Sequence, residues 1–248
     1  MTIQRTYDII KSKTHIKLRK QHIIDRGVFS VTYVLFISEL LSDIEIGTPI
    51  YTKQIAYELS KKFNITEKEA SAATAVALKR LIDGNKFPEL RSYQKGIYYK
   101  TKSTPFGEMG INKEKLIADK YILPDIGYET GLTLMNNLGL TTQISNERVI
   151  ATNLAKDCVR SDKKLGVTIK PPKTKISPQN KKYLQLLDAL ELLDKTPIDE
   201  DNPYLLIARH IHNEKLQYGK LLAYADSYYN KKTVLHLAHT ASAGGVNI

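Results

Sequence analysis

The sequence TEKEASAATAVALKRL, residues 66–81, decides how the N-terminal part of the chain folds. Thr66 is followed three residues later by Glu69, which is the spacing of a capping box and predicts that a helix begins here. Apolar side chains then recur at helical spacing and predict one buried face. The opposite face keeps short or hydrogen-bonding side chains, as expected of a helix that approaches base edges in the major groove of DNA. The residues expected in the core are Ala70, Ala73, Ala77, Leu78 and Leu81.

Two further helices are expected before this one. Residues 30–42 are dense in apolar side chains and predict a well-buried helix, after which the sequence GTP at residues 47–49 breaks the chain. Thr52 is the candidate N-cap of the second helix, whose apolar stripe runs from Ile55 to Phe63. A short turn then leads into the helix that begins at Thr66.

A β-hairpin is expected after the three helices. Residues 87–93 and 96–100 have the character of short strands, and the polar turn Gln94-Lys95 lies between them. The order helix, helix, turn, helix, hairpin is that of a winged helix-turn-helix. We therefore predict this DNA-binding fold for residues 30–102.

The third helix and the tip of the hairpin form the predicted DNA-binding surface. Ser71 and Thr74 are placed to contact base edges, and Lys79 and Arg80 to contact phosphates. A basic hairpin tip commonly follows the phosphate backbone or enters the minor groove. An ordinary solvated hairpin, or a winged unit that binds protein, is the alternative. The predicted DNA-binding residues are Lys68, Ser71, Thr74, Lys79, Arg80, Arg91, Tyr93 and Lys95.

The charge distribution favours a polyanionic partner. The chain carries 37 Lys and Arg against 26 Asp and Glu, a net charge of +11. Residues 1–102 hold 18 basic and 10 acidic side chains, and residues 156–182 hold nine and two, so two basic blocks alternate with nearly neutral ones. Such an excess indicates nucleic acid first and an acidic membrane surface second.

Alternatives stay open for the N-terminal part of the first basic block and for the second block. Residues 1–29 predict a basic helical extension, which either packs its few isoleucines on the body of the protein, follows the phosphate backbone or makes a dimer contact. The second block is either a solvated charged face or a second nucleic-acid surface, for more operator DNA or for RNA. The candidate residues of that second surface are Lys163, Lys164, Lys170, Lys173 and Lys175.

A larger mixed α/β domain is expected over residues 103–248, so that the whole chain is α+β and mainly helical. A linker with Pro105 and two nearby glycines opens this part. Helical patterns then cover residues 113–121, 128–138, 183–193, 204–212 and 216–229, strand patterns cover 148–152 and 165–170, and a last short element covers 234–238.

We expect no catalytic residue, metal or cofactor, and therefore no enzyme. Cys158 is the only cysteine, which excludes an intramolecular disulfide and a Cys₄ or Cys₂His₂ zinc site. His210 and His212 point to different faces of a helix, while His236 and His239 could share a metal but have no carboxylate nearby in the sequence. The N-terminus lacks the apolar core of a signal peptide, and no apolar run is long enough to span a bilayer. These features predict a cytoplasmic protein with no membrane partner.

Several runs of residues, taken in order, resemble the AbiEi family, the antitoxins of AbiE-type abortive infection systems. ALKRLI, GNK and KGIYYK at residues 77–82, 84–86 and 95–100 are similar to the recognition helix and wing of that family. GYETG and NLGLTTQ at residues 127–131 and 137–143 are similar to the opening of its C-terminal domain, and a strand at 149–153 and a helix at 183–193 follow in the expected order. The resemblance covers roughly residues 50–200, and the extension 1–29 is longer than the family pattern.

The resemblance implies a bifunctional antitoxin. Its winged domain would repress its own operon by binding inverted repeats in the promoter. Its C-terminal domain would counteract a nucleotidyltransferase-type toxin in a type IV phage-defence system, in which the two proteins need not form a stable complex. Two other functions stay open. A nuclease or RNA-modifying enzyme with a winged targeting domain predicts clustered carboxylates or histidines within residues 103–248, and a structural adaptor predicts a neutral or acidic winged unit.

Overall fold

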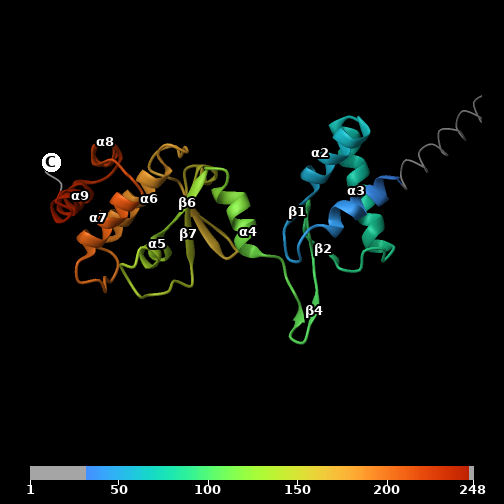
Figure 1. Cartoon of the computed structure of the whole chain (residues 1–248), viewed down its shortest axis with the longest axis horizontal. Helices are drawn as coiled ribbons and strands as arrows, with labels where there is room; N and C mark the ends of the chain where they lie inside the picture. Colours follow the sequence, from blue (N-terminus) through green and yellow to red (C-terminus); the bar gives the residue numbers. More distant parts are fainter. Residues whose placement is uncertain (1–31, 246–248) are drawn as a thin grey trace, which may run out of the picture. The chain divides into compact units, whose positions relative to one another are not determined.

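The computed structural model describes residues 32–245, which form an α+β protein of two compact units divided between Asn112 and Lys113 (Figure 1). The basic helix expected in residues 1–29 lies outside the described residues. The sequence placed the boundary at residue 102, but the following residues bond back to the first unit. The backbone N–H of Asn112 donates to the carbonyl of Gly47 over 2.7 Å, and this contact ties the segment to the first unit.

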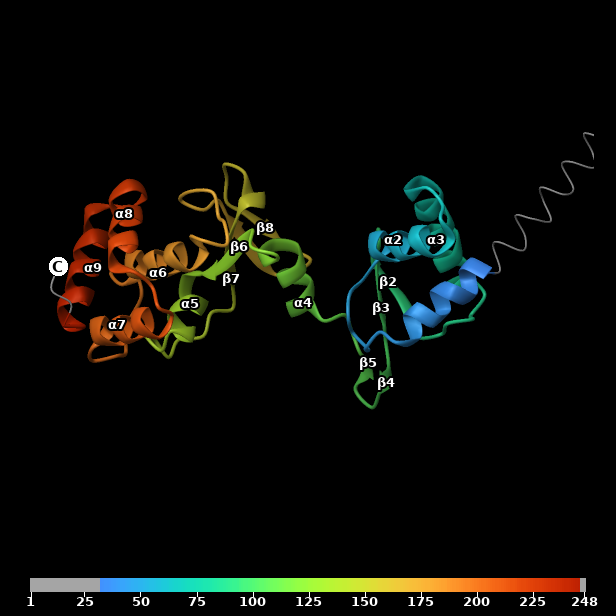
Figure 2. The same cartoon turned by 45° about the horizontal axis from the view of Figure 1, so that its top comes forward.

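The first unit consists of helices packed beside a small antiparallel sheet whose strand order is β1-β3-β2. A further two-stranded hairpin, β4 with β5, follows directly after β3 in the chain (Figure 2). Residues 32–42 are helical, and the elements that follow are β1 Ile50–Tyr51, α2 Thr52–Phe63, α3 Glu67–Asp83, β2 Leu90–Gln94, β3 Ile97–Lys100, β4 Ser103–Thr104 and β5 Gly107–Glu108.

The capping box predicted at the start of α3 is confirmed. The hydroxyl of Thr66 accepts a hydrogen bond from the backbone N–H of Glu69 at 3.3 Å, and the Glu69 carboxylate accepts from the backbone N–H of Thr66 at 3.2 Å. The preceding helix ends at Asn64, whose left-handed backbone (φ 50°) reverses the chain, and the N–H of Ile65 returns to the carbonyl of Ser60. This short turn sets α2 and α3 against each other.

The predicted cap of α2 is wrong by one residue. Tyr51 is the N-cap, and Thr52 is the first helical residue. The Thr52 hydroxyl instead donates over 2.7 Å to the carbonyl of Gly96, in the turn between β2 and β3. This turn is remote from Thr52 in the sequence, so local capping preference could not reveal the partner.

The core of the first unit gathers apolar side chains from all of its helices and from β1 and β2. The ring of Phe63, at the end of α2, meets Tyr33 and Phe36 edge-on, with centroid distances of 4.8 and 5.5 Å. Edge-to-face rings add to the free energy of apolar burial, and here they fix the helix of residues 32–42 on α2. The fully buried members include Ile37, Leu41, Leu59, Leu78, Leu81 and Leu90.

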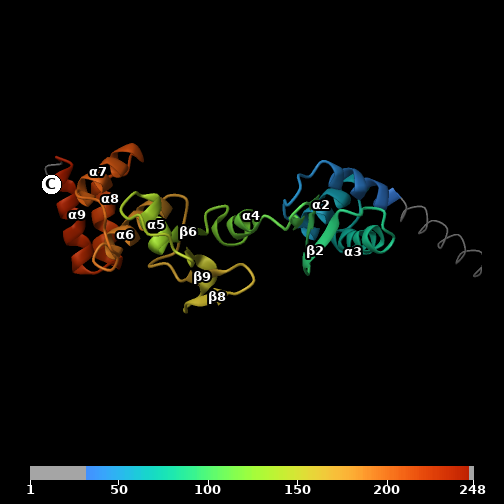
Figure 3. The same ribbon diagram turned by 90° about the horizontal axis from the view of Figure 1, so that it is seen from below.

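The second unit joins a four-stranded sheet to a group of helices (Figure 3). The strand order is β6-β7-β9-β8, with β7 and β9 parallel and the other pairs antiparallel. The elements are α4 Lys113–Ile117, η1 Ala118–Ile122, β6 Gly127–Thr130, α5 Gly131–Asn137, β7 Arg148–Thr152, η2 Asn153–Ala155, β8 Arg160–Asp162, β9 Val167–Lys170, α6 Lys181–Leu192, α7 Pro203–Asn213, α8 Tyr218–Tyr228 and α9 Lys231–Ala243.

Two predictions for this unit are wrong in part. The helix expected over residues 128–138 begins only at Gly131, because Tyr128 to Thr130 pair with β7 as strand β6. Gly131 has a φ of +72°, which changes the backbone direction between strand and helix. The short element expected at 234–238 is the 13-residue helix α9, which Asn230 caps through its side-chain oxygen and the N–H of Thr233. Within residues 32–245, no helix has the length and apolar character needed to cross a bilayer.

A buried carboxylate connects the sheet to the helices of the second unit. Asp188 on α6 is 1% exposed and accepts hydrogen bonds from the hydroxyls of Thr130 at 2.9 Å and Tyr229 at 2.8 Å. The Lys170 ammonium group lies 2.9 Å from the same carboxylate. Burial raises the pKa of Tyr229 and of neighbouring Tyr128, so both phenols stay protonated at neutral pH. The cluster joins β6, β9, α6 and the end of α8.

Candidate nucleic-acid interface

Helix α3 buries one face and leaves the opposite face exposed. The buried residues follow the spacing i, i+4, i+7, i+8 and i+11 from Ala70, which is one stripe of an α-helix. The exposed face therefore lies on the side away from the core. The exposed residues of the helix are Glu67, Lys68, Glu69, Ser71, Ala72, Ala75, Val76, Lys79, Arg80 and Asp83, and the buried ones are Ala70, Thr74, Ala77, Leu78 and Leu81.

Thr74 does not belong to the exposed face, which corrects its prediction as a base contact. Its relative exposure is 0%, and its hydroxyl oxygen has no hydrogen-bond partner among the described residues. Ala73 was expected in the core, but it is only partly buried. The buried stripe of α3 instead runs through Ala70, Thr74 and Ala77. A side chain on that line cannot contact a base edge.

The other predicted residues of α3 lie where a ligand can reach them. Lys68, Ser71 and Lys79 are exposed, and neither lysine forms an ion pair with any residue in the described range. Arg80 is exposed in the last turn. Val76, which the sequence analysis did not select, is also exposed, and continuing the helical spacing from Ala72 would have found it.

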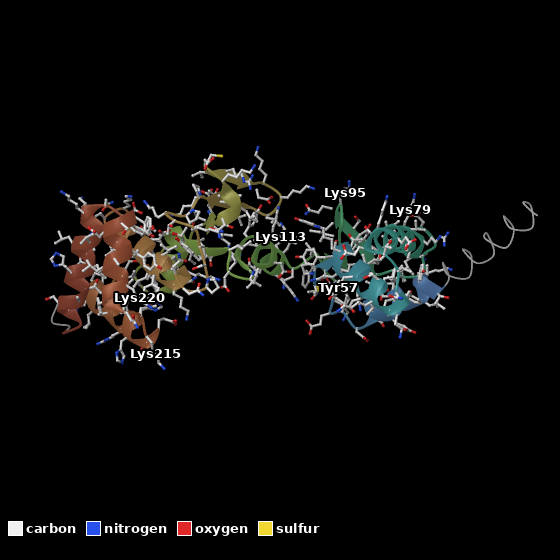
Figure 4. All side chains as sticks on the ribbon, turned by 90° about the horizontal axis from the view of Figure 1, so that it is seen from above. Tyr57, Lys79, Lys95, Lys113, Lys215 and Lys220 are labelled. Carbon is white, nitrogen blue, oxygen red and sulfur yellow. The ribbon has the colours of Figure 1, made fainter. Side chains whose placement is uncertain are left out.

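The β2–β3 hairpin presents Lys95 on the same side as α3. Lys95 and Gly96 form the turn, Gly96 has a φ of +80°, and a register irregularity lies between Ser92 and Gln94. Lys95 is exposed, and Tyr93 beside the irregularity is half-buried. In Figure 4 the Lys79 and Lys95 side chains extend toward the same side of the first unit. The hydrogen bond from Thr52 to Gly96 holds this turn on α2.

Arg91 is not near the hairpin tip, which corrects the second predicted contact. It lies near the start of β2, where its guanidinium contacts the Glu108 carboxylate of β5 at 2.6 Å and the Pro88 carbonyl at 2.6 Å. The hydrogen bond from Arg91 lowers the pKa of Glu108. The sequence analysis assigned residues 104–110 to a linker, so the hairpin that supplies Glu108 was not expected. Arg91 anchors that second hairpin.

The net positive charge of the first unit is small within the described residues. Residues 32–112 carry 11 basic and nine acidic side chains, a net charge of +2. Residues 1–31, outside the described range, carry seven basic and two acidic ones, so most of the expected excess belongs to that segment. On α3 itself, Glu69 is engaged with Thr66, while Lys68 and Lys79 flank the exposed face. Helix α3 carries three basic and three acidic side chains, so its exposed face is distinguished by the positions of Lys68 and Lys79 and not by an excess of positive charge.

The second basic block does not form one free surface. Lys170 contacts buried Asp188, and Lys173 lies 3.1 Å from Glu191, so these two lysines stabilise the packing of α6. Lys163 and Lys164 are exposed in the turn between β8 and β9, and Lys175 is exposed in the segment before α6. The two ion pairs correct the prediction for Lys170, which reaches buried Asp188, and engage exposed Lys173 with Glu191. Both acidic partners lie on α6, and sequence proximity does not reveal them.

The histidines of the second unit form contacts of their own. Nδ1 of His236 lies 2.8 Å from the Tyr204 hydroxyl, and Nε2 lies 3.3 Å from the Asp194 carboxylate. The His236 hydrogen bond lowers the pKa of Asp194. His239 packs against the Tyr204 ring. In the part of the chain that the structure describes, no three His, Cys, Asp or Glu side chains are placed to hold a metal ion, and Cys158 is exposed.

Comparison of the chain with models of protein families, with curated proteins and with solved structures finds no match.

Proposed function

We propose that this protein is a sequence-specific DNA-binding regulator, and that its first unit is a winged helix-turn-helix. The observation that carries the proposal is the exposed face of α3, with Lys68 and Lys79 at its ends and Lys95 of the hairpin on the same side (Figure 4). A helix with a short, partly polar surface can enter the major groove, and flanking cations can contact phosphates. The β2–β3 hairpin would be the wing.

The order of elements supports this proposal. A helix, β1, α2, a short turn, α3 and then a hairpin that pairs with β1 is the arrangement expected of a winged recognition unit. Helix α2 buries its Ile55–Leu59 side against the core, and α3 packs on it. In this geometry α2 would lie across the phosphate backbone while α3 enters the groove.

We further propose that the chain represses its own operon and counteracts a nucleotidyltransferase-type toxin through its second unit, without itself being an enzyme. The resemblance of residues 50–200 to the AbiEi antitoxins supports this role. The second unit has its own apolar core over α5 to α9, so a separate activity there is physically reasonable. The alternative is a nuclease or RNA-modifying enzyme with a winged targeting domain, for which the group to examine is His236 with Asp194 and Tyr204.

The proposal is tested by a double variant, Lys79→Ala with Arg80→Ala, in a binding titration with DNA from upstream of the gene. We expect operator binding to be lost while circular dichroism shows the same helix content, because both side chains lie outside the buried stripe of α3. The matched control is Lys215→Ala with Lys220→Ala, which removes two charges from exposed positions of the second unit (Figure 4). Equal loss in both double variants would mean that only total charge matters. Unchanged binding by the α3 variant would contradict the assignment of α3.

The antitoxin role is tested with the same variants in cells that express the toxin. If the two units act separately, the α3 variant loses repression and still rescues growth. Loss of rescue by this folded variant would contradict the proposed division of roles.

A further inference from the structure

The exposed face of α3 has an aliphatic patch at its centre. Val76 is 50% exposed, and Ala72 and Ala75, at i−4 and i−1 from it, are exposed as well. Lys68 lies one turn before Ala72, and Lys79 lies one turn after Val76. The face therefore has an apolar middle with one lysine at each end, and the end turns also carry the exposed carboxylates of Glu67, Glu69 and Asp83. Apart from Ser71 at its edge, the middle offers a base no hydrogen-bonding side chain.

The spacing of the two lysines suits a helix held in the major groove. Lys68 and Lys79 are separated by roughly 16 Å along the axis, at 1.5 Å per residue. The groove is about 12 Å wide. Lysine side chains at the two ends can therefore contact phosphates that flank the groove while the aliphatic patch faces the base edges. Lys95 on the hairpin would add a contact outside the groove.

The chemistry of the patch discriminates between bases. Purines present N7 together with O6 or N6 in the major groove, and an apolar side chain that covers these groups leaves them without hydrogen-bond partners. Thymine presents a 5-methyl group, which gains from apolar contact. A guanine-reading site would instead need Arg or Lys at this position, and an adenine-reading site Asn or Gln.

We infer that Val76, with Ala72 and Ala75, recognises thymine 5-methyl groups in the operator. This inference rests on the proposed DNA binding of α3 and adds the kind of base that the helix reads. Lys68 and Lys79 position the helix, and the aliphatic patch selects among sequences.

The test compares promoter DNA that contains thymine with the same duplex made with deoxyuridine, which lacks only the 5-methyl group. A scrambled duplex is prepared in both forms, so that a general effect of uracil on DNA shape is measured separately. We expect the promoter to lose roughly fourfold in affinity for each contacted thymine, the equivalent of one buried methyl group. The scrambled duplex should bind equally weakly in both forms.

A thermodynamic cycle with Val76→Ala assigns the effect to this side chain. The variant should bind thymine DNA more weakly and should discriminate less between thymine and uracil. Leu35→Ala is the matched control, because Leu35 is 60% exposed on another helix of the same unit. It should keep the full thymine–uracil difference.

The outcomes separate the two proposals. Preference for the promoter with equal affinity for its thymine and uracil forms would overturn the thymine inference and leave DNA recognition by α3 intact. A thymine–uracil difference that Val76→Ala leaves unchanged would also overturn it. Equal binding to promoter and scrambled DNA would contradict the proposed function itself.

Discussion

The hydroxyl of Thr52, in the first turn of α2, donates a 2.7 Å hydrogen bond to the carbonyl of Gly96, at the turn of the β2–β3 hairpin. The backbone N–H of Thr52 donates to the same carbonyl at 3.0 Å. Two elements that are far apart in the sequence are thereby held together beside the proposed DNA-binding face. Gly96 has a φ of +80°, and a Cβ there would lie 3.2 Å from the Thr52 hydroxyl, so the close approach favours glycine.

Thr52→Val should loosen this connection. The change removes one partly buried hydrogen bond and keeps the shape of the side chain, so we expect a loss of about 1 kcal/mol in the free energy of unfolding of the first unit. Operator affinity should fall as well, because the hairpin is less firmly placed. Urea unfolding and a DNA titration measure the two effects. Ser60→Ala removes an exposed hydroxyl of the same helix and should change both by little. Equal effects of the two variants would contradict the role of Thr52.

Thr74→Val should stabilise the first unit. The Thr74 hydroxyl is fully buried and has no partner among the described residues. Replacing it by a methyl group of similar size removes an unsatisfied polar group, and we expect a gain of about 1 kcal/mol. DNA affinity should be unchanged, because the side chain faces the core. A variant that unfolds normally but loses operator binding would show that Thr74 contacts DNA after all.

Lys95→Ala and Arg91→Ala should affect different properties. Lys95 is exposed at the hairpin turn, so its removal should weaken DNA binding and reduce the slope of log affinity against log salt by about 1. Arg91 is bonded to Glu108 and the Pro88 carbonyl, so its removal should loosen the β4–β5 hairpin and leave the salt slope as it is. Salt-dependent titrations, with hydrogen exchange of residues 103–109, separate the two. If only Arg91→Ala reduced the salt slope, Arg91 and not Lys95 would be the residue that contacts DNA.

Lys170→Ala should destabilise the second unit. It leaves the 1%-exposed carboxylate of Asp188 without its cation, although the hydroxyls of Thr130 and Tyr229 stay in place. Breaking a buried ion pair costs about 3 kcal/mol or more, and hydrogen exchange of α6 amides should accelerate accordingly. Lys163→Ala, in the exposed β8–β9 turn, is the control and should leave exchange unchanged. Normal hydrogen exchange in Lys170→Ala together with weaker nucleic-acid binding would contradict this structural role and would show that Lys170 belongs to a nucleic-acid-binding surface.

Local patterns in the sequence predicted much of this fold. The Thr66 and Glu69 spacing located the start of α3, and the apolar periodicity of residues 183–193 located most of α6. The errors concern features that depend on distant partners. Tyr128 to Thr130 look helical by composition, but pairing with β7 makes them a strand. Arg91, Thr52 and Lys170 are positioned by Glu108, Gly96 and Asp188, none of which is close in the sequence.

The same distinction applies to the candidate site. Lys68, Ser71, Lys79 and Lys95 are exposed as the periodicity and the hairpin pattern predicted. Thr74 was misplaced because small residues occur on both faces of α3, so the apolar stripe could be drawn through Ala73 or through Thr74 with similar support. Only the packing of α3 in the folded unit decides between the two, and Thr74 is the buried one.

The most direct test of the central claim is a titration of the full chain, over a series of salt concentrations, against DNA from upstream of its gene and against a scrambled duplex. Each neutralised phosphate contributes about −0.9 to the slope of log affinity against log salt, so affinity should fall steeply with salt. We predict tighter binding to the upstream DNA at every salt concentration, as the proposed reading of base edges by the exposed face of α3 requires. Equal, weak binding to both duplexes would show only a basic surface and would contradict sequence-specific recognition by α3.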